Sequence, residues 1–139
     1  MNIVITGGSG FVGSYLCERL INDGHNLIVV DNLLTGSTEN ISDLMDNDNF
    51  SFIEHDVQNH IEIENKVDYV LHFASAASPK AYTEHPVNTL KAGSIGTLNT
   101  LGLAKKHNSQ YLLASTSEVY GDPLILSLIH ISEPTRQAE

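Results

Sequence analysis

The stretch Ile3-Val4-Ile5-Thr6-Gly7-Gly8-Ser9-Gly10-Phe11-Val12-Gly13 decides the fold that we expect for this chain. Its first three residues are β-branched and apolar, which is typical of a strand buried on both faces. Glycines then recur at every third position, just before a segment with apolar residues at helical spacing. Such a turn lets a phosphate approach the backbone N–H groups of a helix N-terminus. The stretch predicts a pyrophosphate cradle, with a plain strand-turn-helix as the alternative.

A second predicted strand, residues 27–30, supports the cradle because it ends in Asp31. An acidic residue at this strand end, about 20 residues past the cradle, is where the ribose of adenosine is held in dinucleotide-binding folds. The next residue is Asn32 and not an arginine, which favours NAD over NADP. We therefore expect the Asp31 carboxylate to accept hydrogen bonds from the ribose hydroxyls of NAD.

Two further predicted strands also end in residues that suit a ligand site. The strand at residues 50–54 runs into His55-Asp56-Val57, and Asp56 is a candidate acceptor for the adenine amino group, with an ordinary surface aspartate as the alternative. The strand at residues 67–73 breaks into the small residues Ala74-Ser75-Ala76-Ala77-Ser78. Small side chains allow the backbone to pass close to a ligand.

An acidic segment, residues 43–49, follows a short predicted helix that Ser37 or Thr38 would cap. Its aspartates and asparagines raise the possibility of calcium binding. The segment lacks the central glycine and the terminal glutamate of an EF-hand loop. We interpret it as a solvated turn and predict no metal site in the chain.

A long helix is predicted at residues 86–107, because Pro86 suits the first turn of a helix. At 100° per residue, one side of this helix carries three lysines and an asparagine: Lys91, Ile95, Asn99, Gly102, Lys105 and Lys106. This face suits an anionic ligand. The alternative is a solvated face, since lysines near a helix C-terminus are favourable with the helix dipole alone.

A fifth predicted strand, residues 111–114, ends in Ser115-Thr116-Ser117-Glu118-Val119-Tyr120-Gly121-Asp122-Pro123. Strands that alternate with helices predict the α/β class, with a Rossmann-type, doubly wound parallel sheet and right-handed crossovers. Ligands bind such sheets beyond the carboxyl ends of the strands. The glycine turn, Asp31, Asp56, Ser75 and Thr116 all follow strand ends, so we expect them to meet in one dinucleotide site.

Composition narrows the possible partners and the location of the protein. The chain has 139 residues and a formal net charge of -10, which argues against nucleic acid and anionic membranes as partners. Cys17 is the only cysteine, so no internal disulfide forms, and this suits a reducing cytoplasm. A first strand at residue 2 or 3 leaves no room for a signal peptide, and no apolar run approaches the length of a membrane span. We expect a soluble cytoplasmic domain, too short for an enzyme that also needs a substrate domain.

The last fourteen residues, 126–139, continue none of the preceding pattern. They resemble a translated sequencing adapter, which we interpret as read-through and exclude from the fold. A pair of metal ligands at His130 and Glu133 is the alternative. The sequence therefore predicts an incomplete NAD-binding Rossmann domain at residues 1–125, truncated before a C-terminal substrate domain.

Four motifs in order, the glycine turn, Asp31-Asn32 with Thr35-Gly36, His55-Asp56-Val57 and the segment from Ser115 to Pro123, resemble the extended short-chain dehydrogenase/reductase family. The resemblance covers residues 1–125. Within the family the chain is most similar to the UDP-glucuronate decarboxylases, through Ala77-Ser78-Pro79, Thr89-Leu90-Lys91, Ile95-Gly96-Thr97-Leu98-Asn99, Leu101-Gly102-Leu103-Ala104-Lys105 and Leu113-Ala114-Ser115-Thr116-Ser117-Glu118.

The resemblance implies roles for individual residues. Contacts to NAD are implied for Gly7, Gly10, Phe11, Val12, Gly13, Asp31, Asn32, Leu34, Thr35, Gly36, Asp56, Val57, Phe73, Ser75 and Ala114. Contacts to the substrate, UDP-glucuronate, are implied for Lys91, Asn99, Gly102, Lys105 and Lys106. Thr116 matches the active-site Ser/Thr of the family, and Ser117 and Glu118 match the pair near the sugar carboxylate. The parent enzyme is implied to be a homodimer.

The chemistry implied is oxidation of the sugar at C4 by NAD, loss of carbon dioxide from the resulting β-keto acid, and reduction to UDP-xylose. The family's base is a tyrosine followed four residues later by a lysine. This chain contains no Tyr-x-x-x-Lys, and Ala92-Gly93 stands where the family has a polar residue and an asparagine. The chain alone is therefore expected to be inactive. The alternatives are a UDP-sugar 4-epimerase, a dTDP-glucose 4,6-dehydratase and a non-catalytic nucleotide-binding module.

Overall fold

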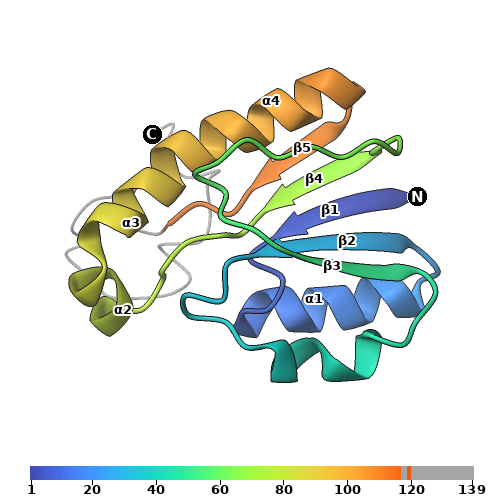
Figure 1. Cartoon of the computed structure of the whole chain (residues 1–139), viewed down its shortest axis with the longest axis horizontal. Coiled ribbons are helices and arrows are strands. Elements are labelled where there is room, and N and C mark those ends of the chain that lie inside the picture. The colour runs from blue at the N-terminus through green and yellow to red at the C-terminus, as the bar shows by residue number, and fades with distance from the viewer. Residues whose placement is uncertain (117–118, 120–139) are drawn as a thin grey trace, which may run out of the picture.

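A parallel five-stranded sheet forms the centre of the computed structural model, which describes residues 1–116 and 119. The strands are β1 (Asn2–Thr6), β2 (Asn26–Asp31), β3 (Phe50–Glu54), β4 (Tyr69–His72) and β5 (Gln110–Leu113), in the spatial order β3-β2-β1-β4-β5. The order reverses between β1 and β4. Figure 1 shows that all strands point the same way, so their carboxyl ends share one edge. The predicted α/β, Rossmann-type fold is confirmed.

Helices cover both faces of this sheet (Figure 1). On one face, α1 (Phe11–Asn22) and the 3-10 helix η1 (Thr38–Leu44) pack through Cys17 and Ile41 against Ile3 and Ile5. On the other face, α4 (Thr97–His107) packs Leu103 against the strands. Because β1 is buried on both sides, its apolar run has the unbroken pattern of a central strand, and each such side chain contributes about 1.5–3 kcal/mol.

The connection between β3 and β4 contains no helix. Instead, Val57, Ile61, Ile63 and Val67 are buried against the core on the α4 side of the sheet. Asn99 of α4 donates to the carbonyls of Val57 and Asn59, at 2.8 and 2.9 Å. The crossover segment therefore packs beside α4 and, together with this helix, covers one face of the sheet.

Two elements differ from the sequence prediction on the way to β5. A short helix that was not predicted, α2 (Pro79–Glu84), begins after Ser78, whose hydroxyl accepts from the Ala81 N–H at 3.2 Å. The single helix predicted at residues 86–107 is interrupted: α3 (Pro86–Lys91) continues into a π-helical turn, η2 (Ala92–Gly96), and then into α4. Strand β4 is also shorter than the predicted residues 67–73, although the backbone N–H groups of Asp68 and Phe73, on either side of it, still donate to carbonyls of β1.

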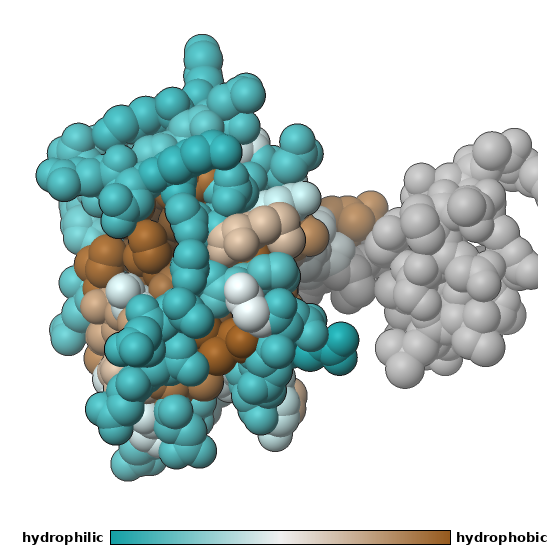
Figure 2. All heavy atoms as spheres, turned by 90° about the vertical axis from the view of Figure 1, so that its right-hand side faces the viewer, coloured by the Kyte–Doolittle hydropathy of each residue, from teal (hydrophilic) through white to brown (hydrophobic). Residues whose placement is uncertain are grey.

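The edge where the strands begin is predominantly hydrophilic, as Figure 2 shows. Its polar groups pair with one another: Asn26 donates to the Asn2 side chain at 2.9 Å, and Lys66 lies 3.0 Å from Asp68. These contacts pair polar side chains of β1, β2 and the segment before β4 at this end of the sheet. The opposite, carboxyl-end edge holds the candidate site.

Candidate functional site

A cleft of about 960 Å³ opens at the carboxyl ends of the strands. It is lined by every residue for which the sequence predicted a contact to NAD: the glycine turn and start of α1 (Gly7, Gly10, Phe11, Val12, Gly13), the segment after β2 (Asp31, Asn32, Leu34, Thr35, Gly36), the segment after β3 (Asp56, Val57), and the ends of β4 and β5 (Phe73, Ser75, Ala114). Whether these residues touch a cofactor remains a prediction. Their convergence follows from the parallel topology.

The glycine turn has a backbone that only glycine allows. Gly7 has φ +75°, and a Cβ on it would stand 2.7 Å from the Ala74 nitrogen. A Cβ on Gly13 would stand 2.2 Å from the Gly7 carbonyl oxygen. Gly10 caps α1 without a side chain, so the first amides of the helix, which have no intrahelical acceptor, remain available at the cleft. This geometry fits a diphosphate.

Asp31 links the glycine turn to the segment after β2. Its carboxylate accepts from the Ser9 N–H at 3.0 Å and from the Leu33 N–H at 2.9 Å, and the residue is only 7% exposed. Leu33 has φ +57°, a strained conformation that this hydrogen bond supports. A carboxylate has about four acceptor positions, so two remain for other donors. Asp31 thus shapes the loop in addition to the ligand-facing role that its position predicted.

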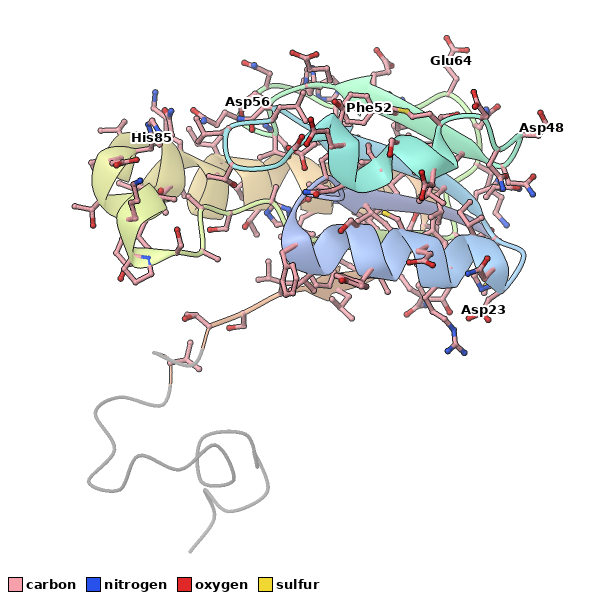
Figure 3. All side chains as sticks on the ribbon, turned by 90° about the horizontal axis from the view of Figure 1, so that it is seen from below. Asp23, Asp48, Phe52, Asp56, Glu64 and His85 are labelled. Carbon is pink, nitrogen blue, oxygen red and sulfur yellow. The ribbon has the colours of Figure 1, made fainter. Side chains whose placement is uncertain are left out.

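Asp56 is held by three donors beyond β3. The side chain of Asn32 donates to it at 3.0 Å, and Gln58 donates through its backbone N–H at 2.9 Å and its side chain at 3.2 Å. In Figure 3, Asp56 and His85 lie toward the same end of the molecule, whereas Asp23 and Asp48 lie toward the opposite end. Asp56 is therefore a fixed acceptor at the cleft, and the acidic residues near Asp48 are separate from it.

The far wall of the cleft comes from α2, which was not predicted, and from α3 and η2 of the predicted long helix, through residues that were not predicted to contact a ligand. Tyr82, Asn88, Thr89, Ala92 and Gly93 line it. Ser78-Pro79 is a cap-and-proline start signal that would have revealed α2. The π turn has no comparable signal in the sequence.

His72, the last residue of β4, also lines the cleft and was not predicted to do so. It is 3% exposed, and its Nδ1 lies 2.6 Å from the Thr6 hydroxyl. Burial lowers the pKa of His72 below its usual value, and a hydrogen bond to the Ala92 backbone partly opposes this shift. A buried, neutral imidazole therefore stands where β1, β4 and the π turn meet.

None of the five residues predicted to contact UDP-glucuronate lines the cleft in the described part of the chain. Asn99 is occupied by the crossover carbonyls, and Lys106 lies 3.2 Å from Glu62 of the same segment. Lys91, Gly102 and Lys105 are exposed elsewhere on the helix. The prediction placed them on one face by counting 100° per residue. The π turn takes one extra residue, which rotates the four of these residues that follow it by roughly 100° relative to Lys91, which precedes it.

Of the three predicted catalytic residues, the structure describes only Thr116. Thr116 lines the cleft beyond β5, and its carbonyl accepts from the Val119 N–H at 3.4 Å. Ser117 and Glu118 lie outside the described residues, as do His130 and Glu133. Cys17 is buried outside the cleft, and desolvation followed by the charge of Asp31 raises its pKa to about 12, so it is no nucleophile.

Residues 1–116 and 119 contain no group of three or more His, Cys, Asp or Glu side chains placed to hold a metal ion. Their helices are all too short or too polar to cross a membrane.

Comparison with known proteins identifies the family that the chain matches. Residues 3–137 match the NAD dependent epimerase/dehydratase family. UDP-glucuronic acid decarboxylase 1 of Danio rerio is 54% identical over 121 residues, which are 87% of this chain and 28% of that protein. UDP-glucose 4-epimerase of Thermotoga maritima, solved with UDP-glucose, has a TM-score of 0.76 at 33% identity, over 91% of this chain and 41% of that one. The dTDP-glucose 4,6-dehydratase of Bacillus anthracis, solved with NAD, has a TM-score of 0.74 at 29% identity, over 88% and 40%.

The chain therefore belongs to the NAD dependent epimerase/dehydratase family, which confirms the resemblance found in its motifs. The predicted likeness to UDP-glucuronate decarboxylases is confirmed as well. The chain spans 28% of the length of the zebrafish relative that it matches.

Proposed function

We propose that this chain is the NAD-binding part of a UDP-glucuronate decarboxylase. The observation that carries the proposal is the cleft itself: the glycine turn, Asp31, Asp56 and the end of β4 line one cavity at the point where the strand order reverses. This is where dinucleotides bind in open parallel sheets. The 54% identity to a protein named UDP-glucuronic acid decarboxylase supports the substrate class.

The residues of the cleft fit NAD part by part. The amides at the start of α1 would hold the diphosphate, and Asp31 would accept from the adenosine ribose while its charge repels a 2′-phosphate. Asp56, with its fixed carboxylate, would accept from the adenine amino group. Phe73, Ser75 and Ala114 line the same cleft as Thr116, and the reactive end of the cofactor would lie beside them.

NAD, when bound, would supply the hydride acceptor and donor for the C4 position of the sugar. Thr116 would hydrogen-bond the reacting oxygen, and Ser117 with Glu118 would lie near the sugar carboxylate. Lys91, Asn99, Gly102, Lys105 and Lys106 remain proposed contacts of UDP-glucuronate. The chain has no Tyr-x-x-x-Lys to remove and return the proton, so we expect it to bind without turnover.

Calorimetric titration of the chain with NAD and with NADP tests the cofactor half of this proposal. We expect binding of NAD and at least tenfold weaker binding of NADP, because Asp31 disfavours a second anion beside it. Equal affinities for NAD and NADP would contradict the proposed role of Asp31 in selecting NAD. A chain that binds neither cofactor would overturn the proposal. Incubation with NAD and UDP-glucuronate should release no carbon dioxide above the uncatalysed rate. Sustained release would contradict the expected inactivity.

A UDP-sugar 4-epimerase or a 4,6-dehydratase is the second candidate, favoured by TM-scores of 0.76 and 0.74 to such enzymes. Product analysis on a protein that extends this sequence through a Tyr-x-x-x-Lys separates these activities from decarboxylation. If the complete reading frame of the gene lacks that motif, a non-catalytic nucleotide-binding module would be favoured. We also propose that residues 1–125 are the native part of the domain and that residues 126–139 are adapter-derived.

Assembly and location complete the proposal. Val87, Leu90, Leu98 and Leu101 on α3 and α4 are apolar and more than 40% exposed, which supports a homodimer of the parent enzyme. The single cysteine is free and buried, which suits the reducing cytoplasm. The charge of -10 supports a protein that avoids nucleic acid and anionic membranes.

A further inference from the structure

His72 stands at a junction of four elements. Its backbone pairs with Thr6 of β1, and its carbonyl accepts from the Ala114 N–H beyond β5 at 3.0 Å. Its imidazole meets Thr6 through Nδ1 and the π turn through the Ala92 backbone. The ring also lies against Gly96, where an added Cβ would stand 3.8 Å from Cε1 of the ring. The side chain thus connects the sheet to the helix that forms the far wall.

The hydrogen bonds around His72 form one directed series. A backbone acceptor such as the Ala92 carbonyl requires a ring N–H, and a neutral imidazole carries only one. A proton on Nε2 is the arrangement that satisfies both contacts, because Nδ1 then accepts from the Thr6 hydroxyl, 2.6 Å away. The Thr6 oxygen in turn accepts from the Ala74 N–H at 3.4 Å. Ala74 and Ala92 both line the cleft, as does His72.

We propose that His72 is a positioning residue that couples the two walls of the cofactor cleft, the Ala74–Ser75 backbone beyond β4 and the π turn at Ala92–Gly96. The inference rests on the proposed binding of NAD to this cleft. Thr6 and His72 are 0% and 3% exposed, so solvent competes little for these hydrogen bonds and each bond restrains the group that it holds. Turns of this type are rare and often lie at functional sites, and the imidazole provides a contact between this turn and the sheet.

Affinity for NAD provides the first test. In His72→Phe the ring shape is retained and both hydrogen bonds are lost, and we expect NAD binding by the chain to weaken about five- to tenfold. Thr6→Val should weaken binding to a smaller extent, whereas Thr6→Ser, which keeps the hydroxyl, should restore it to within about twofold. Because the two sites act on one series, the losses in the double variant should not add.

His107→Phe is the matched control. The Nε2 of His107 lies 3.1 Å from the Ile63 carbonyl, so this variant also loses a partly buried hydrogen bond from a histidine, but outside the cleft. It should lower the thermal midpoint and leave the Kd for NAD unchanged. A His72→Phe chain that loses no more affinity than His107→Phe would overturn the inference while the proposed function stands. A wild-type chain that binds no NAD would overturn both.

The tautomer of His72 is a second readout, and one that needs no ligand. Long-range proton–nitrogen NMR spectra of the chain at neutral pH should show His72 with its proton on Nε2 and with Nδ1 as a hydrogen-bonded acceptor. Thr6→Val should shift the Nδ1 resonance, and Thr6→Ser should shift it far less. A proton on Nδ1, or an Nδ1 resonance that ignores Thr6→Val, would contradict the proposed series even if His72→Phe fails to fold.

Discussion

The two halves of the predicted ligand site behave differently. Each residue predicted to contact NAD lines one cleft, whereas each residue predicted to contact the sugar nucleotide on the helix lies outside it in the described part of the chain. The first set lies in the segments that follow the parallel strands, including the first turn of α1, and the second lies on a helix that Figure 1 shows running along one face of the sheet. The two sets differ in what fixes the direction of a side chain.

A residue just after a parallel strand is delivered to the cleft by the topology, whatever the details of the strand before it. A residue on a helix reaches a ligand only if the helix has the right rotation. The π turn at Ala92–Gly96 changes that rotation for all of α4. A prediction made from a strand end therefore tolerates small local errors, whereas a prediction made from a helix face depends on every turn that precedes it.

The largest effect is expected when the strand-end half is broken at Gly13. In Gly13→Ala the new Cβ would stand 2.2 Å from the Gly7 carbonyl oxygen, so the turn must deform, at a cost of about 3 kcal/mol or more. NAD binding should be lost with it. Gly102→Ala is the control on α4, where an added Cβ meets nothing within 4 Å, and it should stabilise the chain by about 0.5–1 kcal/mol. Urea unfolding of both variants measures the difference.

Asp31→Ala should have the next largest effect. It removes a charge-assisted acceptor worth about 1.5–3 kcal/mol, so NAD binding should weaken by roughly ten- to a hundredfold and NADP binding should be spared. The Ser9 and Leu33 amides also lose their acceptor, so the thermal midpoint should fall. Asp31→Asn separates the two roles, since it keeps an acceptor for one of these amides without the charge. An equal loss of affinity for NAD and NADP would indicate that Asp31 only stabilises the loop and does not select the cofactor.

Asn99→Ala should cost stability by about 1–3 kcal/mol, because the carbonyls of Val57 and Asn59 lose their donor. Thermal unfolding checks this value. Asn99→Asp, which cannot donate from its carboxylate, should be no better. If Asn99→Ala instead leaves stability unchanged and weakens UDP-glucuronate binding, Asn99 belongs to the substrate site as its sequence position predicted.

Lys106→Ala should have the smallest effect. Lys106 and Glu62 form an exposed pair at 3.2 Å, and such pairs contribute less than about 1 kcal/mol. The change in unfolding free energy should shrink further in high salt. Lys105→Ala, which removes a neighbouring lysine that has no ion pair among the described residues, should change stability even less. A larger loss for Lys105→Ala would indicate that the helix face has a role beyond solvation.

The sequence predicted the fold and the cofactor half of the cleft because both depend on residue type in a short window. Ile3 to Ile5, the glycine spacing and Asp31 each identify a strand end without knowledge of distant contacts. The π turn, the role of Asn99 and the burial of His72 depend on residues far apart in the chain, such as Val57 and Thr6. No local pattern encodes such contacts. Helix α2 is intermediate, since Ser78-Pro79 carried a signal that had not been used.

Titration of the 15.2 kDa chain with NAD, followed by amide chemical shifts in NMR spectra, tests the central claim most directly. We predict shifts at strand ends and in the glycine turn, among them Gly7, Gly13, Asp31, Asp56 and Ser75. The amides of Gly102, Lys105 and Lys106 should remain unchanged. Shifts confined to α4, or saturating shifts that leave the glycine turn unmoved, would contradict the assignment of this cleft to the cofactor.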